Sequence, residues 1–270
     1  MIAEPYLSSR SLPADSAPPR YRRAVIVLPA FNEEESLPPL FHSIRRELAG
    51  TGIGYRVIVV DDGSVDATAR VTREAAKSLP AILVSHPGNR GLAAAIRTGL
   101  EKAAAEADPD DVIITMDADN THPPGLIPRM IGLIGEGHDV VIASRFQRGS
   151  RVLGVPWHRN LLSYGARALF TIALPIHGVR DYTCGYRVYR AAAIQRALAD
   201  YGDDFVSERG FSCMVDVLLK LRYQRLIMGE VPMVLRYDQK GGASKMHVAR
   251  TALQTLSLIV RRKFYGASVK

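Results

Sequence analysis

Two aspartates with the spacing of a metal site, Asp117 and Asp119, stand at the end of the apolar run 111–117. Carboxylates two positions apart at a strand end point the same way, and together they can bind a hard divalent cation. Magnesium or manganese held in this way keeps open positions for phosphate oxygens and can neutralise a diphosphate leaving group. Because an isolated Asp-x-Asp is common in surface loops, the position at a strand end is what favours a metal site here.

A second pair, Asp61 and Asp62, closes the apolar run 55–62 and precedes Gly63 and Ser64. An aspartate at the mouth of a parallel sheet can accept hydrogen bonds from a ribose hydroxyl or a base N–H group. The same residues also make a good turn and helix cap. We expect both roles to be filled, with one aspartate of the pair facing a ligand.

The segment 88–91, Gly-Asn-Arg-Gly, opens a predicted helix. Its glycines permit close backbone approach, and free N–H groups at a helix start suit an anion. The segment matches neither a Walker loop nor the G-x-G-x-x-G fingerprint, so alone it indicates little.

These residues need a scaffold that brings strand ends together. Short apolar runs alternate with helical patterns, which indicates an α/β fold with a mostly parallel central sheet and helices on both faces. Ligands of such sheets bind at the carboxyl ends of the strands. We expect Glu33, Glu34 and Glu35 in the first turn of the first helix, where carboxylates stabilise the positive helix end. The apolar runs are 24–29, 55–62, 81–86, 111–117 and 138–144, and the helical patterns are 34–49, 65–78 and 90–107.

The second half of the chain alternates less regularly. No repeat or linker divides it, so we expect one domain at 21–264 after a mobile tail at 1–20, with halves at 24–145 and 146–264. The further elements that we expect are the helix 157–174, the loop 180–187 with a short strand after it, the helix near 210–221, the strand pair around 225–236 and the helix 245–262.

The composition is that of an ordinary globular protein, with 270 residues, 47% of them hydrophobic and 23% charged. The formal net charge of +8 favours anionic partners such as nucleotide phosphates, lipid phosphates or nucleic acid. Two cysteines, Cys184 and Cys213, are too few for a disulfide framework, which favours a reducing cytoplasm. No run is apolar and long enough for a signal peptide or a membrane-spanning helix, so we expect any membrane contact to be at the surface.

Several segments occur in the order seen in family 2 glycosyltransferases, and over about 24–250 the chain most resembles the polyprenyl-phosphate mannosyl- and glucosyltransferases of that family. The ordered set is specific, whereas any single member is not. The resemblance implies a GT-A fold, a Mg²⁺ or Mn²⁺ cofactor and inverting transfer of a hexose from a nucleotide-diphosphate sugar, of GDP-mannose or UDP-glucose type, to polyprenyl phosphate. The segments are PAFNEEESL, VVDDGSVDAT, HPGNRGLAAAIRTG, MDADNTHPP, SRF, DYTCGYRVYR and GGASK.

The resemblance also implies roles for single residues. The nucleotide-sugar set is Pro29, Ala30, Phe31, Glu33, Asp62, Asp117, Ala118, Asp119 and Arg145. The acceptor set is Arg159, Thr183, Gly185, Tyr186, Arg187, Arg236 and Lys245. The residues implied in catalysis are Asp117, Asp119, Arg145, Asp181, Arg236 and Lys245, and those implied in metal binding are Asp117, Asp119 and Thr121.

Two positions depart from the family pattern. Lipid-phosphate members of the family usually have a glutamine where this chain has Thr121, and a threonine hydroxyl is a weaker metal ligand. A position that often holds glutamate in the late helix is Asp216, which we interpret as a helix carboxylate rather than the partner of an acceptor-side arginine.

The acceptor decides whether a general base is needed. A phosphate acceptor is largely ionised near neutral pH, because its second pKa is about 6. A hydroxyl acceptor needs a base, and Asp181 is the candidate. The final predicted helix has an apolar stripe and basic residues, which fits a membrane surface or the protein core. We expect a cytoplasmic protein, peripheral on the inner face of the membrane if its acceptor is a lipid.

Three alternatives remain open at this point. A family 2 transferase with a soluble hydroxyl acceptor fits the same motifs. A nucleotidyltransferase also uses a nucleotide and a divalent metal, but the glycine-rich N-terminal loop expected of that class is missing. A nucleic-acid module fits the net charge, but the basic residues do not interleave with aromatic ones as a single-strand platform requires.

Overall fold

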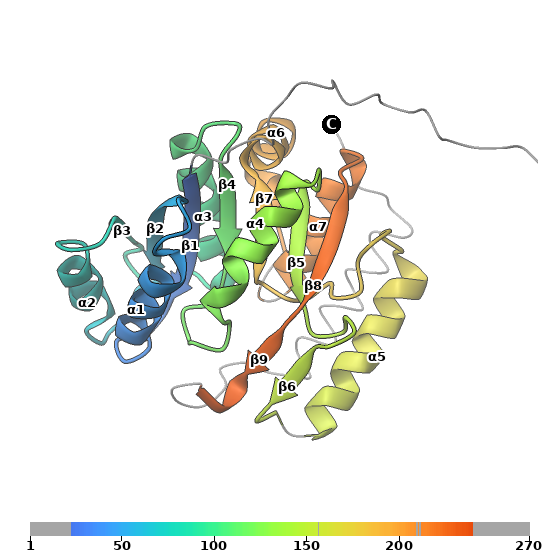
Figure 1. Ribbon diagram of the computed structural model, residues 1–270, viewed down its shortest axis with the longest axis horizontal. Helices are drawn as coiled ribbons and strands as arrows, with labels where there is room; N and C mark the ends of the chain where they lie inside the picture. Colours follow the sequence, from blue (N-terminus) through green and yellow to red (C-terminus); the bar gives the residue numbers. More distant parts are fainter. Residues whose placement is uncertain (1–22, 156, 209, 211, 240–270) are drawn as a thin grey trace, which may run out of the picture.

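Seven strands form the central sheet, in the order β3-β2-β1-β4-β7-β5-β8 (Figure 1). The computed structural model describes residues 23–239 except 156, 209 and 211. β7 runs antiparallel to β4 and β5, and the other neighbouring pairs in this sheet are parallel. The strands are β1 Arg23–Ala30, β2 Gly54–Asp61, β3 Ala81–Ser85, β4 Val112–Thr115, β5 Val140–Ser144, β7 Arg187–Arg190 and β8 Met228–Pro232.

Helices cover both faces of the sheet, as the alternation of segments predicts. In Figure 1, α1 and α4 lie in front of the sheet, and α3, α6 and α7 lie behind it. The helices are α1 Leu37–Leu48, α2 Thr68–Ala75, α3 Leu92–Glu106, α4 Ile127–Gly135, α5 Trp157–Ala173, α6 Ala191–Tyr201 and α7 Ser212–Tyr223. Three short 3₁₀ turns are η1 Pro124–Leu126, η2 Gly202–Val206 and η3 Tyr237–Gln239. The mostly parallel α/β sheet that the sequence predicts is confirmed.

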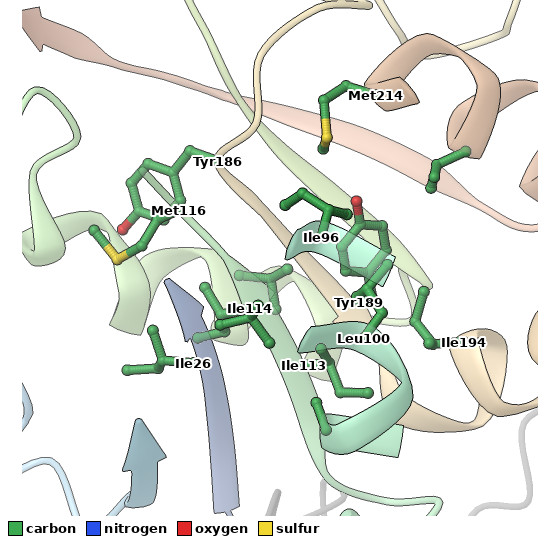
Figure 2. Close-up of a cluster of buried hydrophobic side chains, with 14 of the residues drawn as sticks. Ile26, Ile96, Leu100, Ile113, Ile114, Met116, Tyr186, Tyr189, Ile194 and Met214 are labelled. Carbon is green, nitrogen blue, oxygen red and sulfur yellow. The ribbon is translucent and has the colours of Figure 1, made fainter. Parts of the chain in front are cut away.

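The core lies where the central strands meet the helices. All four residues of β4 are buried, and Figure 2 shows Ile113 of this strand in a cluster with Ile96 and Leu100 of α3 and with Tyr189 of β7. Burying one such aliphatic side chain stabilises the fold by about 1.5–3 kcal/mol. This packing fixes the strands, and therefore fixes the places where their carboxyl ends release the chain into loops.

Two expectations about local structure are wrong. The expected strand pair around 225–236 does not form, because β8 extends the main sheet beside β5 while β9 (Val234–Arg236) pairs with β6 (Arg151–Leu153). The first turn of α1 also contains no acidic residue. Glu33 and Glu34 precede the helix, in a turn where the carbonyl of Glu33 accepts the backbone N–H of Leu37.

The small β6–β9 sheet and α5 lie on the side of the main sheet toward which β1 points (Figure 1). The backbone N–H of Arg236, at the end of β9, donates to the carbonyl of Thr121 after β4, at 3.1 Å. Within the described ranges, no helix has both the length and the apolar character needed to cross a membrane.

Candidate active site

Hydrogen bonds between loops join the carboxyl ends of three parallel strands. Asn32, after β1, donates its backbone N–H to the hydroxyl of Ser64 after β2, at 2.9 Å. Asn120, after β4, donates its side-chain amide to the carbonyl of Ser36, at 2.7 Å. Both asparagines have positive φ, 54° and 61°, which this residue type tolerates better than most. The three loops therefore form one connected rim.

The Asp62 carboxylate lies at the start of α3, where the sequence analysis expects an anion to bind. Its Oδ1 accepts the backbone N–H of Arg90 at 2.9 Å and lies 2.7 Å from His86 Nδ1, and its Oδ2 accepts the N–H of Gly91 at 2.7 Å. Asp61 accepts the N–H of Ser64, which is the expected turn role. The anion bound at the start of α3 is thus a side chain of the protein, and a nucleotide contact of Asp62 stays a prediction.

Asp117 and Asp119 lie on the same rim, in the loop after β4. Thr121 donates its hydroxyl to Asp119 Oδ1 at 2.7 Å and its backbone N–H to the same oxygen at 3.2 Å. Asp119 and Thr121 are buried, whereas the side chain of Asp117 is 35% exposed. Thr121 therefore orients Asp119, and its own binding to a metal stays a prediction.

His122 fixes the backbone of Asp117. Its Nδ1 accepts the N–H of Asp117 at 3.0 Å, so in the neutral ring the proton is on Nε2, which lies 3.7 Å from Asp117 Oδ2. Because the Asp117 N–H occupies the Nδ1 lone pair and the proton occupies Nε2, the neutral ring has no free lone pair for a metal. The ring stacks on Tyr186 with centroids 5.2 Å apart, and the Tyr186 hydroxyl donates to the carbonyl of Pro123 at 3.1 Å. Tyr186 is buried, and in this structure it supports the aspartate loop.

Gly185 brings the loop 181–187 against the aspartates. A Cβ atom at this position would lie 3.3 Å from Asp117 Oδ1, which is a tight contact for any side chain. The carbonyl of Gly185 accepts the hydroxyl of Thr115, on β4, at 2.7 Å. The glycine therefore lets this loop approach Asp117 closely without displacing the carboxylate.

Asp181 and Arg145 form a buried ion pair beside these residues. Arg145 donates Nε to Asp181 Oδ2 at 2.8 Å and Nη2 to Asp181 Oδ1 at 2.7 Å, and its backbone N–H also donates to Oδ2 at 3.0 Å. Arg145 Nη2 further donates to the hydroxyl of Thr183 at 2.6 Å. The backbone N–H groups of Thr183 and Cys184 also donate to Asp181 Oδ1, at 3.3 and 3.1 Å. The pair fixes a guanidinium cation in one orientation.

The geometry argues against the prediction that Asp181 acts as a general base. Its side chain is fully buried, and both oxygens already accept hydrogen bonds. Burial raises the pKa of a carboxyl group, but the charge and hydrogen bonds of Arg145 prevail and hold the pKa of Asp181 below its usual value. Burial lowers the pKa of Arg145, but the Asp181 charge prevails and raises it. Asp181 therefore positions Arg145, which stays charged.

Other predicted residues lie in different surroundings. Arg187 is fully buried and donates to the carbonyls of Met214 and Tyr182, at 2.7 and 2.8 Å, so it faces the core in this structure. Arg236 is part-exposed, and its guanidinium contacts Asp238 at 3.0 Å. Lys245 lies outside the described residues, as does the side chain of Arg159.

The remaining nucleotide-binding candidates stand at the end of β1 and on the loops after β1 and β4. Ala30 is buried and its carbonyl accepts the N–H of Asp62 at 2.8 Å. Glu33 donates its backbone N–H to the hydroxyl of Thr68 at 2.8 Å. Ala118 is buried, whereas Pro29 and Phe31 are partly exposed. Their contacts with a nucleotide remain predictions.

Asp216 is a helix carboxylate, as interpreted, with a buried partner. Its Oδ2 accepts Lys220 Nζ at 2.6 Å and the hydroxyl of Ser207 at 2.9 Å, and both charged side chains are buried. Lys220 also donates to the carbonyl of Asp204. This cluster ties α7 to the η2 turn.

The donor set fits a hard divalent cation shared with a ligand. The described residues include no group of three or more His, Cys, Asp or Glu side chains placed to enclose a metal. Two aspartates, with a threonine hydroxyl on one of them, leave coordination positions for phosphate oxygens and water, as Mg²⁺ requires.

Sequence reasoning missed three residues of this site. Glu230 accepts two backbone N–H groups of the loop 180–187. His86 contacts Asp62, and its place at the end of the third apolar run is a signal that could have found it. Asn120 joins two loops and lies inside the aspartate motif, where only its positive φ distinguishes it.

The sequence profile of glycosyl transferase family 2 matches residues 25–198. Among curated proteins, the chain is 31% identical over 217 residues to a dolichol-phosphate mannosyltransferase of Pyrococcus furiosus, covering 80% of this chain and 57% of that protein. It is 29% identical over 227 residues to a polyprenol monophosphomannose synthase of Mycolicibacterium smegmatis, covering 83% and 81%. The chain thus spans little more than half of the first relative and most of the second.

Solved structures share the fold. Glucosyl-3-phosphoglycerate synthase from Mycobacterium tuberculosis, in complex with Mn²⁺, UDP and glucosyl-3-phosphoglycerate, superposes with a TM-score of 0.63 at 20% identity, covering 90% of this chain and 80% of that chain. At this identity the likeness supports the fold alone. The profile match covers more than half of the chain and includes Asp117, Asp119 and the Arg145–Asp181 pair, so this protein belongs to glycosyl transferase family 2.

Proposed function

We propose that this protein transfers a hexose from a nucleotide-diphosphate sugar to a polyprenyl phosphate at a membrane surface, with inversion at the anomeric carbon. The observation that carries the proposal is the state of Asp181. Its oxygens are held by Arg145 and its pKa is lowered, so it offers no base to a hydroxyl acceptor. A phosphate acceptor needs none, because it is already an anion.

The donor half of the site would hold the leaving group. Asp117 and Asp119 would hold Mg²⁺ or Mn²⁺, which supplies positive charge to the departing diphosphate. Arg145 adds a second, fixed cation close to Asp117, whose charge contributes to the raised pKa of the arginine. Cations that are already oriented stabilise developing negative charge without reorganising during the reaction.

Aromatic side chains lie between Arg145 and α5. The guanidinium of Arg145 lies 5.4 Å from the Phe146 ring centroid, and that ring meets Tyr164 of α5 edge-on at 5.2 Å. Beyond this contact the described part of α5 exposes Leu169 and Ile172, the latter by 81%. Leu153 of β6 and Val234 of β9 are also exposed.

This arrangement supports a lipid acceptor over a soluble one. A phosphate bound near Arg145 would have an apolar surface beside it for a polyprenyl chain, and Arg167 adds a cation 5.2 Å from the same Phe146 ring. Apolar side chains with basic residues around them suit an anionic membrane surface. The names of the two curated relatives, which act on dolichol phosphate and polyprenol phosphate, agree with this class of acceptor.

The test is an acceptor comparison with the purified protein. GDP-mannose and UDP-glucose are each offered with Mn²⁺ and with a polyprenyl phosphate, the matching polyprenol, or a soluble sugar, and products are identified by mass spectrometry. The proposal predicts a glycosyl phospholipid with the phosphate acceptor and no product with the free alcohol. Comparable product from the alcohol or the soluble sugar would show that the site activates hydroxyl groups, which contradicts the proposal.

A further inference from the structure

The loop that bears Asp181 is held from behind by a second carboxylate, Glu230 of β8. Glu230 Oε1 accepts the backbone N–H groups of Arg180 and Asp181, each at 2.6 Å. Two short bonds from adjacent amides to one oxygen fix the direction in which the chain enters the site. Glu230 itself is half-buried and stands on a strand that pairs with β5.

A second contact shows that the loop rests directly on β8. Gly178 has φ of 80°, and a Cβ atom there would lie 2.3 Å from the carbonyl oxygen of Met228. The Met228 carbonyl and the Glu230 side chain, two residues apart on β8, therefore both lie against this segment. The backbone of β8 and the Glu230 side chain therefore hold the loop at two points before Asp181.

The position of this loop matters for catalysis because of two residues in it. Asp181 orients Arg145, and Gly185 sets the approach to Asp117. An error in the position of the loop moves a cation and a metal-site carboxylate together. A shift of about 1 Å at such groups can cost on the order of 100-fold in rate.

We propose that Glu230 is a positioning residue for the transfer reaction, acting through the backbone of Arg180 and Asp181 on Arg145. The hydrogen bonds rather than the negative charge are what this role requires. Burial raises the pKa of Glu230, and the two amide donors offset this only in part, so the charge is a cost to the folded protein. The inference rests on the proposed function only for the identity of the ligands.

Two substitutions at Glu230 distinguish the effect of its hydrogen bonds from the effect of its negative charge. Glu230→Gln keeps an acceptor oxygen at full reach and removes the charge. Glu230→Asp keeps the charge, but it is one methylene shorter and draws the oxygen away from both amides. Glu101→Gln, at an exposed position of α3, is the matched control. We expect Glu230→Gln to stay within about threefold of the parent in affinity for GDP or UDP with Mn²⁺, and Glu230→Asp to lose about tenfold or more.

Two further readouts distinguish positioning from general stability. In an Arg145→Ala background, Glu230→Asp is expected to have a smaller effect on nucleotide affinity than in the parent, because the part transmitted through Arg145 is already lost. Hydrogen exchange of the ligand-free protein is expected to speed up at the amides of Arg180 and Asp181 in Glu230→Asp and to stay unchanged in Glu230→Gln. This second readout needs no nucleotide, so it decides the inference even if neither GDP nor UDP binds. Unchanged exchange in Glu230→Asp, additive effects with Arg145→Ala, or a larger loss in Glu230→Gln than in Glu230→Asp would each overturn it.

Discussion

Arg145 and Asp181 meet through two parallel hydrogen bonds, Nε to Oδ2 at 2.8 Å and Nη2 to Oδ1 at 2.7 Å, in a setting where the carboxylate has no access to solvent. Such paired bonds set both the position and the plane of the guanidinium. The carboxylate is used entirely for this purpose. The site therefore has a fixed cation at this place, and Asp181 serves to orient it.

Asp181→Asn tests whether the paired hydrogen bonds of Asp181 orient Arg145. The amide can accept one bond from Arg145, but its NH₂ group opposes the other, so the arginine loses its fixed plane. We expect the catalytic rate to fall about 10- to 100-fold, with the loss independent of pH between about 6 and 9 because no base is removed. Steady-state kinetics across that range checks it. A loss that grows as the pH rises, into the range where a base at position 181 is deprotonated, would instead indicate that Asp181 titrates during the reaction.

Gly185→Ala tests the close approach to Asp117. The new methyl group would lie 3.3 Å from Asp117 Oδ1, so either the loop or the carboxylate must shift. We expect weaker Mn²⁺ binding, by about tenfold, measured by electron paramagnetic resonance of the free ion. Gly165→Ala on α5 is the control, because no atom lies within 4 Å of its added methyl group. Equal Mn²⁺ affinity in both variants would contradict a role for Gly185 at the metal site.

Thr121→Val removes the hydroxyl that orients Asp119. The valine has nearly the same shape but removes the hydroxyl donor to Asp119 Oδ1, while the backbone N–H of residue 121 is kept. We expect the apparent Mn²⁺ requirement to rise about 10-fold, with the melting temperature little changed. A metal titration of donor turnover measures this. An unchanged requirement would show that Asp119 is oriented without the hydroxyl.

Glu230 predicts a pH dependence of stability. Burial raises its pKa in the folded protein above the ordinary 4.5, so ionisation destabilises the fold relative to the unfolded chain. The contribution is favourable at low pH and is lost as the pH rises through the folded pKa. Glu230→Gln lacks this loss, so we expect its stability relative to the parent to increase between about pH 4 and pH 7. Urea unfolding at several pH values checks it, and a constant difference would contradict the raised pKa.

Asp238→Asn frees Arg236 from its ion pair. The hydrogen bonds of Arg236 lower the pKa of Asp238, so the aspartate is charged throughout the neutral range and competes with any anion for the arginine. If Arg236 binds the acceptor phosphate, we expect the variant to have a lower KM for polyprenyl phosphate, by about two- to fivefold, since exposed ion pairs are weak. A KM unchanged within error would place Arg236 outside the acceptor site.

The parts of the fold that follow from local pattern were predictable. The five apolar runs became β1 to β5 because β-branched residues buried on both faces leave few alternatives to a parallel strand. The insertion of antiparallel β7 between β4 and β5 was not predictable, because its pairing joins segments far apart in the sequence. The departure of β9 from β8 toward β6 has the same cause.

The candidate site likewise contains residues that the sequence predicted and residues that it could not predict. Asp117, Asp119 and Asp62 were found because they end apolar strands, and all three lie on the joined loops. The roles of Asp181 and Arg187 were not predictable, since each depends on partners that the fold supplies, Arg145 for one and two backbone carbonyls for the other. Glu230 had no sequence signal, because its function is to accept backbone bonds from a loop some 50 residues earlier, a separation that the fold closes.

The most direct test of the account is nucleoside diphosphate release by the purified protein. GDP-mannose and UDP-glucose are each offered with Mn²⁺, with and without polyprenyl phosphate, to the parent protein, to Asp119→Ala and to the control Glu101→Ala. The account predicts release from one of these donors that requires the metal, rises with the lipid phosphate, collapses in Asp119→Ala and persists in Glu101→Ala. Release that is indifferent to the lipid phosphate, or that survives in Asp119→Ala, would contradict it.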